Sequence, residues 1–146
     1  MSDFWRKWVV IWCLAIGLFG VVLTLAAVPG NDSMLVALLS QFGPAPQSID
    51  APLQFATGLM GAVTMGWAAT LYMAFRAAEL LPADEAGRFW HGILGGVVLW
   101  YVVDCSLSVA TRFGLNVVPN TLFLIAFLLP LWAAGVLKPQ RLSTAS

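Results

Sequence analysis

The chain has 146 residues, of which 60% are hydrophobic and only 10% are charged. These proportions lie far outside the averages of soluble domains, so they exclude an ordinary soluble protein and predict a single integral membrane domain over residues 1–146. Seven basic and seven acidic side chains cancel, and no basic patch is interleaved with aromatic residues. We therefore expect the lipid bilayer, and no nucleic acid, as a partner.

Four stretches are long enough to cross the hydrocarbon core of a bilayer, which takes about 20 mostly apolar residues. They cover residues 8–28, 53–75, 89–111 and 119–137. The first stretch follows Arg6 and Lys7, as a signal peptide would, but it is longer than a signal core, which has about 7 to 15 residues. We therefore expect it to be retained. The fold class is all-α, a four-transmembrane-helix bundle.

The basic residues indicate how these spans are oriented. One side of a four-span chain carries all of the Lys and Arg residues except Arg112, namely Arg6, Lys7, Arg76, Arg88, Lys138 and Arg141. Under the positive-inside rule this side is cytoplasmic, so both termini lie in the cytoplasm and residues 29–52 lie outside. We expect a multi-pass protein of a bacterial inner membrane.

Tryptophan placement agrees with this orientation, because indole rings favour the headgroup region of a bilayer. Four tryptophans lie near the predicted cytoplasmic boundary: Trp5, Trp8, Trp90 and Trp132. Trp67 and Trp100 do not fit this belt, since they lie near the middle of their spans. We expect these two rings to have a role inside the bundle.

The outer loop contains a short helical pattern of its own. After Pro29-Gly30-Asn31, either Asp32 or Ser33 can cap a helix, and Gly43-Pro44 ends it. Apolar residues follow at helical spacing between these signals: Met34, Leu35, Leu38, Leu39 and Phe42. Such a helix is too short to span, so we expect a short interfacial helix that lies on the outer interface with its apolar side against the bilayer. The alternative is a helix that covers the mouth of the bundle.

Small residues recur four apart on the second span, at Gly58, Ala62, Gly66 and Thr70. Rows of this kind allow membrane helices to approach closely. Further pairs occur on the third span (Gly92 and Gly96) and on the first (Gly17 and Gly20). We expect these rows to pack within the bundle, with a seam between two copies of the chain as the alternative. Pro130 is expected to bend the fourth span or to free a carbonyl near residue 126.

Asp104 is the most informative residue, because it lies in the otherwise uncharged run 89–111. A carboxylate at the centre of a bilayer costs about 2.5 to 3.5 kcal/mol on insertion scales, so it normally faces a bundle interior or a wet cavity. At about 100° per residue, its face of the helix is shared by Trp100, Tyr101 and Ser108. This face is predicted to hold the functional site.

Polar residues of the other spans lie at the same outer depth, namely Thr24, Gln54, Thr57, Asn116 and Asn120. Together with Asp104 they predict an outward-facing polar pocket, whose floor is made by Trp100, Tyr101 and Trp67. Arg112 is the candidate counter-charge. Its eight-residue separation from Asp104 corresponds to about 12 Å along the helix axis, so we expect Arg112 to act through space.

The two cysteines, Cys13 and Cys105, are not expected to form a disulfide. Their predicted depths differ by about 10 Å or more, whereas a bridge requires Cα atoms within about 7 Å. Neither belongs to a CxxC pair or to a Cys/His cluster with metal spacing. No metal site and no catalytic motif is predicted.

Three functional classes follow from these residues. The favoured class is a non-enzymatic accessory or hydrophobic-ligand-binding subunit, in a larger membrane complex or a homo-oligomer. The second is a proton-coupled small-molecule carrier in which Asp104 gains and loses a proton. The third is an intramembrane enzyme for a lipid or terpenoid, with Asp104 as general acid or base and Tyr101 assisting.

A purely structural role is also open, in which Asp104 only fixes the register of neighbouring helices. No cofactor is predicted outright. Met60, Met65 and Met73, with Trp67 among them, could line a pocket for a quinone, a carotenoid or a lipid.

Overall fold

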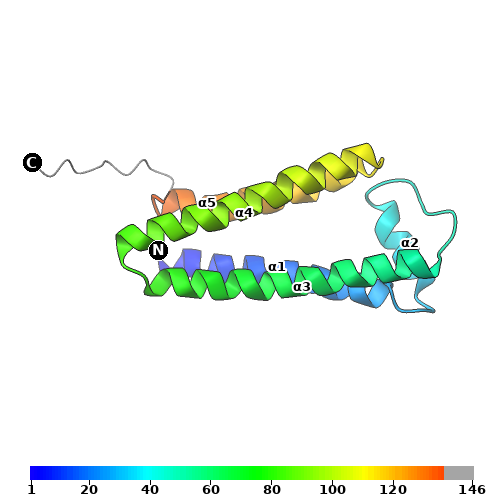
Figure 1. The fold of residues 1–146 in the computed structure, drawn as a ribbon, viewed down its shortest axis with the longest axis horizontal. Coiled ribbons are helices and arrows are strands. Elements are labelled where there is room, and N and C mark those ends of the chain that lie inside the picture. The colour runs from blue at the N-terminus through cyan, green and yellow to red at the C-terminus, as the bar shows by residue number, and fades with distance from the viewer. Residues whose placement is uncertain (137–146) are drawn as a thin grey trace, which may run out of the picture.

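The computed structural model describes residues 1–136, without the side chains of Ala83 and Asp84. Across this part of the chain it contains helices and no strand (Figure 1). In chain order the helices are α1 (Asp3–Ala26), α2 (Asp32–Ser40), α3 (Ala51–Leu80), α4 (Ala83–Ala110), the short 3-10 helix η1 (Gly114–Asn116) and α5 (Val117–Ala133). The predicted all-α class is confirmed for the described residues.

Four helical segments are long and apolar enough to cross a membrane: α1, α3, most of α4, and η1 together with α5. Each contains most of one predicted span. The boundaries differ at the ends: α3 continues past the predicted Phe75 to Leu80, and α5 ends at Ala133. Residue Leu137, where the fourth span was predicted to end, lies outside the described residues, as do Lys138 and Arg141.

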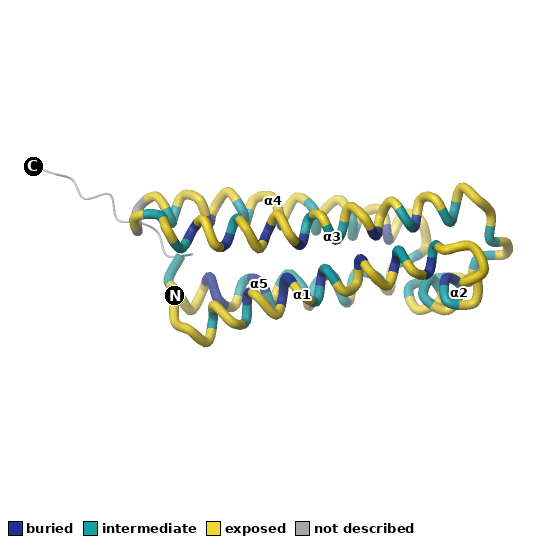
Figure 2. Tube along the Cα trace, turned by 90° about the horizontal axis from the view of Figure 1, so that it is seen from below, coloured by how far each residue is buried: buried dark blue, intermediate teal, exposed yellow. Residues whose placement is uncertain are grey.

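The four long helices lie side by side in two layers. Figure 1 shows α4 and α5 above α1 and α3, and the turned view in Figure 2 places α3 with α4 and α1 with α5. Each helix therefore contacts two antiparallel neighbours, and the contact between α1 and α3 is by far the most extensive. We call the end with Arg6, Lys7, Arg76 and Arg88 the basic end, and the end with Arg112 the distal end.

Glycines bring the backbones of α1 and α3 into direct contact. A Cβ atom added at Gly20 would lie 2.8 Å from the carbonyl oxygen of Gly61, and one added at Gly61 would lie 2.7 Å from that of Gly20. Neither position has room for a side chain. Gly17 adds a looser contact with the side chain of Ala68 at 3.7 Å.

The small-residue row predicted on α3 is only partly the row that packs. Gly58 contacts Ala27, but Ala62, Gly66 and Thr70 are exposed, and the next contact is at Gly61. The reason is helical geometry, because a strict four-residue step advances about 40° around a helix of 3.6 residues per turn. The row has therefore turned away from α1 by Gly66.

Aromatic rings form the core where all four long helices meet. Trp12 of α1 stacks on Phe127 of α5 at 5.2 Å between ring centroids, and Phe75 of α3 stacks on Trp90 of α4 at 5.1 Å. Trp12 and Phe75 lie 6.1 Å apart and join the two pairs. Trp90 is buried in this core, so its indole ring contacts other helices and not the exterior. Stacking on Phe75 decides its position.

Two indole groups tie α1 to α5. Trp8 Nε1 donates to the carbonyl of Ala126 at 2.8 Å, and Trp12 Nε1 donates to that of Phe123 at 2.9 Å. The Ala126 carbonyl has no helical partner because residue 130 is a proline, which lacks the N–H four residues on. The predicted free carbonyl near residue 126 is thus present, and Trp8 satisfies it.

The short helix α2 lies at the distal end, where it packs against α1 (Figure 1). Its Leu35 is completely buried, with 0% of its surface exposed. In the loop that follows, Gly43 lies so close to Phe113 that an added Cβ would be 2.7 Å from the ring. The predicted helix is therefore present, and its loop joins the first half of the chain to the turn between α4 and α5.

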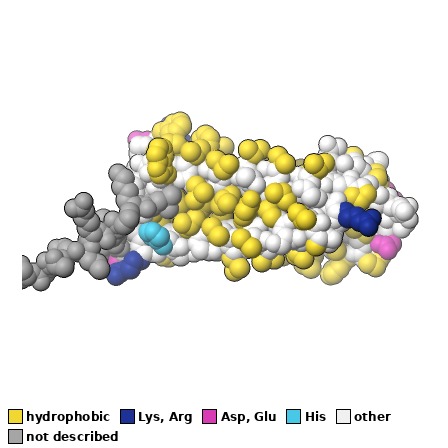
Figure 3. Space-filling model, turned by 90° about the horizontal axis from the view of Figure 1, so that it is seen from above, with side chains coloured by type: hydrophobic (Ala, Val, Ile, Leu, Met, Phe, Trp, Pro, Cys, Tyr) yellow, Lys and Arg dark blue, Asp and Glu magenta, His cyan; other side chains and the backbone are white. Residues whose placement is uncertain are grey.

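The outer surface separates apolar from charged side chains. Figure 3 shows hydrophobic side chains over the middle of one face and charged side chains near its two ends. The exposed residues include large aliphatic ones on every long helix, such as Leu18, Leu59, Leu99 and Leu122. This distribution is that of a surface in contact with hydrocarbon between two polar boundaries.

Candidate functional site

Asp104 of α4 faces the following turn and helix, as its predicted interior position requires. Its Oδ2 accepts a hydrogen bond from Asn116 Nδ2 at 3.2 Å and a shorter one from Asn120 Nδ2. Asn116 Nδ2 also donates to Ser108 Oγ at 3.0 Å. We call Asp104, Ser108, Asn116 and Asn120 the polar latch, because they join α4 to η1 and α5.

The side chains of the polar latch are largely shielded from the exterior of the protein. Ser108 and Asn120 are buried, with 6% and 7% of their surfaces exposed, and Asp104 is half-buried. Hydrogen bonds to a charged group contribute about 1.5 to 3 kcal/mol each, so the latch is a major part of the α4–α5 contact. No described residue donates to the second carboxylate oxygen, Oδ1.

Tyr101 makes a second polar contact one turn closer to the basic end. Its hydroxyl lies 2.9 Å from Thr121 Oγ1, which itself donates to the carbonyl of Val117 at 2.7 Å. Because a hydroxyl has one proton, Tyr101 is the donor to Thr121. Tyr101 is thus engaged with α5, and it makes no hydrogen bond with Asp104 that would let it assist the carboxylate.

The two mid-span tryptophans lie next to each other. The ring centroids of Trp67 and Trp100 lie 5.1 Å apart, and Trp67 also meets Trp12 at 6.4 Å. Thr57 is buried, but its hydroxyl donates to the carbonyl of Leu53 on its own helix at 2.9 Å. Thr57 therefore does not take part in the latch.

Arg112 is exposed and forms no ion pair with Asp104 within the described part of the chain. It instead ends α4 in the left-handed conformation, with a φ of +69°. The N–H of Phe113 donates to the carbonyl of Ser108 at 2.8 Å, the bond that closes a Schellman turn. The backbone of Arg112 thus helps to position Phe113 beside Gly43.

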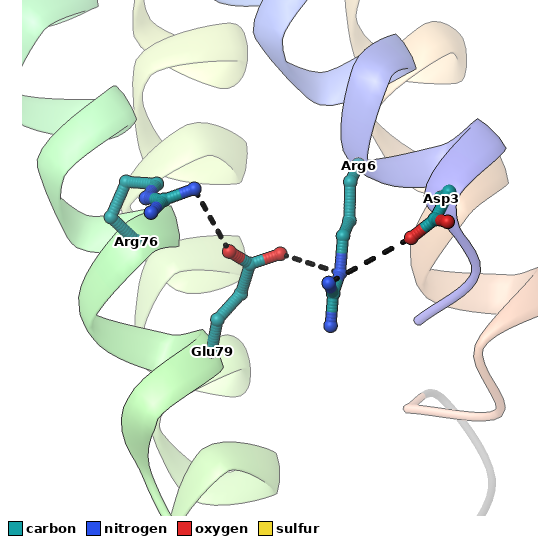
Figure 4. Close-up of polar contacts among 4 residues, drawn as sticks. All are labelled: Asp3, Arg6, Arg76 and Glu79. Carbon is teal, nitrogen blue, oxygen red and sulfur yellow. Dashed lines mark ion pairs between the residues drawn. The ribbon is translucent and has the colours of Figure 1, made fainter.

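An ion-pair cluster that was not predicted from the sequence lies at the basic end. Glu79 of α3 lies between Arg6 of α1 at 3.0 Å and Arg76 at 3.6 Å, and Asp3 lies 3.8 Å from Arg6 (Figure 4). The side chain of Glu79 is only 20% exposed. The spacing of Arg76 and Glu79 on one helix face was the available signal, but only the contact between α1 and α3 brings Arg6 to them.

Two grooves lie between the long helices. One, of about 910 Å³, separates α3 from α4, and its lining includes Trp67, Gly92 and Gly96. The other, of about 320 Å³, lies between α1 and α5 beside Trp8 and Trp12. Neither is lined by Asp104 or by Met60, Met65 or Met73, the methionines of α3 that could have lined a ligand pocket.

The three methionines of α3 lie outside both grooves. Met60 and Met73 point outward, with more than half of their surfaces exposed, and Met65 packs over Gly20 in the contact between α1 and α3. Among the described residues, no group of three His, Cys, Asp or Glu side chains gathers to hold a metal ion. Cys13 and Cys105 are both free thiols.

Comparisons of the chain with protein-family models, with curated proteins and with solved structures find no match.

Proposed function

We propose that the chain is a non-enzymatic subunit of a membrane assembly, which holds a hydrophobic ligand or partner against α4. One observation carries this proposal. In the membrane-spanning part of α4 only 11% of the residues are buried, against 39% in α1. The latch holds one narrow side of α4, and the rest of the helix is left for contact with other molecules.

The proposed topology is a four-helix bundle in a bacterial inner membrane, with both termini in the cytoplasm. It is supported by the charges at the two ends, because Arg6, Lys7, Arg76 and Arg88 lie together and Arg112 lies opposite. α2 then lies at the outer end. The buried Leu35 favours a helix that covers the mouth of the bundle over one that lies on the bilayer.

Within this assembly, Asp104 is proposed to organise the outward polar pocket. Its Oδ2 is fixed by two amides, whereas Oδ1 has no donor among the described residues. A carboxylate arranged in this way has one oxygen for structure and one for a polar group of a ligand or for water.

The proposal is tested by photocrosslinking from two matched positions. Leu99 on α4 and Leu18 on α1 are equally exposed, at 65% each. A photoreactive residue at position 99 is expected to capture one defined partner chain or small hydrophobic molecule in native membranes, whereas position 18 captures bulk lipid. The same products at both positions would refute a dedicated role for α4.

The open oxygen of Asp104 also favours a second candidate, a proton-coupled carrier. In a carrier, Asp104→Asn abolishes pH-dependent uptake by proteoliposomes while the protein still folds. In an accessory subunit, wild-type proteoliposomes show no such uptake for the variant to lose. Uptake that depends on pH in the wild type and survives in Asp104→Asn would remove Asp104 from a carrier mechanism.

A further inference from the structure

The groove between α3 and α4 has walls made of small residues that nothing fills. Ala74 and Ala77 line it from α3, and Gly92 and Gly96 line it from α4. No atom lies within 4 Å of a Cβ added at either glycine. Small residues normally mark the places where membrane helices touch. Here they widen a space of about 910 Å³, within the range of about 300 to 1,000 Å³ typical of small-molecule sites.

The interior of this groove suits hydrocarbon. Thr70 is its polar residue away from the charged mouth, and its hydroxyl already donates to the carbonyl of Gly66 at 2.9 Å. The other wall residues are apolar, with Trp67 at the end farthest from the mouth. A polar group in this part of the groove would find one side-chain donor, the indole N–H of Trp67, which disfavours a ligand with several polar groups there.

The length of the groove corresponds to one leaflet. On α4 the lining extends from Glu85 to Val97, a separation of twelve residue steps or about 18 Å of helix axis. Half of a hydrocarbon core of about 30 Å is about 15 Å. The groove therefore reaches from the headgroup boundary at the basic end to near the centre of the bilayer.

The mouth carries one charge of each sign. Glu85 and Arg88 both line the groove at the basic end, one helical turn apart. Arg88 also interacts within the chain, but a guanidinium has five N–H donors and can share them with a phosphate. The carboxylate of Glu85 can accept hydrogen bonds from an ammonium group. Arg88 and Glu85 together are complementary to a headgroup that contains a phosphate and an ammonium group.

We propose that the α3–α4 groove binds an acyl chain of a phospholipid from the leaflet at the basic end, whose phosphate meets Arg88 and whose primary ammonium meets Glu85. This inference rests on the proposed function and names the class of its hydrophobic ligand. A helix of a second copy fits less well, because it would cover a pair of charges with apolar side chains.

Gly92→Leu/Gly96→Leu is the decisive variant, because it fills the groove without disturbing a protein contact. Leucine also has the better helix propensity, so the fold is expected to survive. Gly95→Leu is the matched control, since an added Cβ there also meets nothing within 4 Å but Gly95 does not line the groove. Circular dichroism and size-exclusion chromatography confirm folding of both variants before binding is measured.

Binding is measured by native mass spectrometry of the full chain in detergent micelles, with added palmitoyl-oleoyl phosphatidylethanolamine. The wild type and Gly95→Leu are expected to retain one lipid per chain, and the double leucine variant to bind at least tenfold more weakly. Equal retention by all three proteins would overturn the proposal. A wild-type dimer that only the double leucine variant disrupts would also overturn it, in favour of a second copy.

Headgroup selection is tested at the mouth with lipids of the same acyl chains. Phosphatidylethanolamine is expected to bind at least tenfold more tightly than phosphatidylglycerol, which has no ammonium, and Glu85→Gln is expected to remove this preference. Arg88→Gln weakens both lipids, whereas Lys7→Gln, a loss of charge at the same end but outside the groove, changes neither. Equal affinity of the wild type for the two lipids would refute the assignment of Glu85.

The two proposals fail in different ways. If the double leucine variant loses a co-purified quinone, pigment or partner chain and still binds the lipid like the wild type, the accessory function stands and the lipid assignment is wrong. If position 99 captures nothing that position 18 does not, and the lipid still depends on the groove, the lipid site stands and the accessory function is wrong.

Discussion

Glycines have opposite consequences in two neighbouring helix pairs of this protein. Between α1 and α3, Gly20 and Gly61 let the two backbones touch, and neither position has room for a Cβ. Between α3 and α4, Gly92 and Gly96 also face a neighbouring helix, yet the space beside them is open. A small residue thus permits close approach, but contacts elsewhere decide whether approach occurs.

The difference follows from what surrounds each pair. α1 and α3 are also joined at the basic end, where Glu79 pairs with Arg6, and no bulky ring lies between them at the glycines. α3 and α4 are held apart by the paired rings of Phe75 and Trp90 and of Trp67 and Trp100. Aromatic pairs with centroids about 5 Å apart act as spacers, and the small residues beside them line a groove.

The largest expected effect is at the tight pair. Gly61→Leu should destabilise the protein by about 3 kcal/mol or more, because the new side chain must displace the backbone of α1. Gly66→Leu on the same helix is the control, since nothing lies within 4 Å of an added Cβ there. Unfolding in mixed micelles by sodium dodecyl sulfate measures both. Equal stability of the two variants would show that the close contact between α1 and α3 at Gly61 does not limit side-chain size.

The polar latch is expected to come second. Asp104→Leu leaves the amides of Asn116 and Asn120 without their acceptor and should cost about 2 kcal/mol, whereas Asp104→Asn keeps an acceptor oxygen and should cost less than about 1 kcal/mol. The same denaturant titration ranks the two variants. If leucine is tolerated as well as asparagine, the latch does not hold α4 to α5.

The indole bonds between α1 and α5 should have an intermediate effect. Trp8→Phe leaves the Ala126 carbonyl without a donor and is expected to cost about 1 to 2 kcal/mol. Pro130→Ala restores a backbone N–H for that carbonyl, so adding it to Trp8→Phe should recover part of the loss. Trp132→Phe, at an indole that is 71% exposed, is the control. A double variant no more stable than Trp8→Phe would contradict the assigned role of Pro130.

The smallest effect is expected at the ion-pair cluster. Glu79→Gln should lower stability by about 0.5 to 1 kcal/mol, because Glu79 is partly buried but both arginines are more than half exposed. The loss should shrink as salt is raised, since added ions screen exposed charges. A loss that does not change between low and high salt would show that Glu79 acts through packing.

The sequence was sufficient for the helices. Runs of apolar residues predicted all four long helices, and the turn residues on either side correctly predicted α2. Its N-cap is Asn31 and not the predicted Asp32 or Ser33. The packing surfaces were harder to predict, because periodicity tells which residues share a face but not which neighbour meets that face. Gly61 was overlooked for this reason, while the row through Gly66 is exposed.

Some residues of the candidate site were predicted from the sequence, but their contacts were not. The face of Asp104, Tyr101 and Ser108 was identified from its spacing, and Asn116 and Asn120 were both expected near Asp104 in depth. Asn116 is a direct partner of Asp104 because η1 folds back toward α4, and a three-residue 3-10 helix has no clear sequence signature. The groove could not be predicted, because it results from the sizes of rings on two helices.

The indole bonds of Trp8 and Trp12 have a consequence for biogenesis. Their acceptors lie 118 and 111 residues later in the chain, so the first helix leaves the ribosome long before its last partner is made. The glycine contact between α1 and α3 can form as soon as that hairpin has been inserted. We therefore expect assembly to finish with the insertion of the last helix, and a chain truncated before Val117 to be a substrate for quality-control proteolysis.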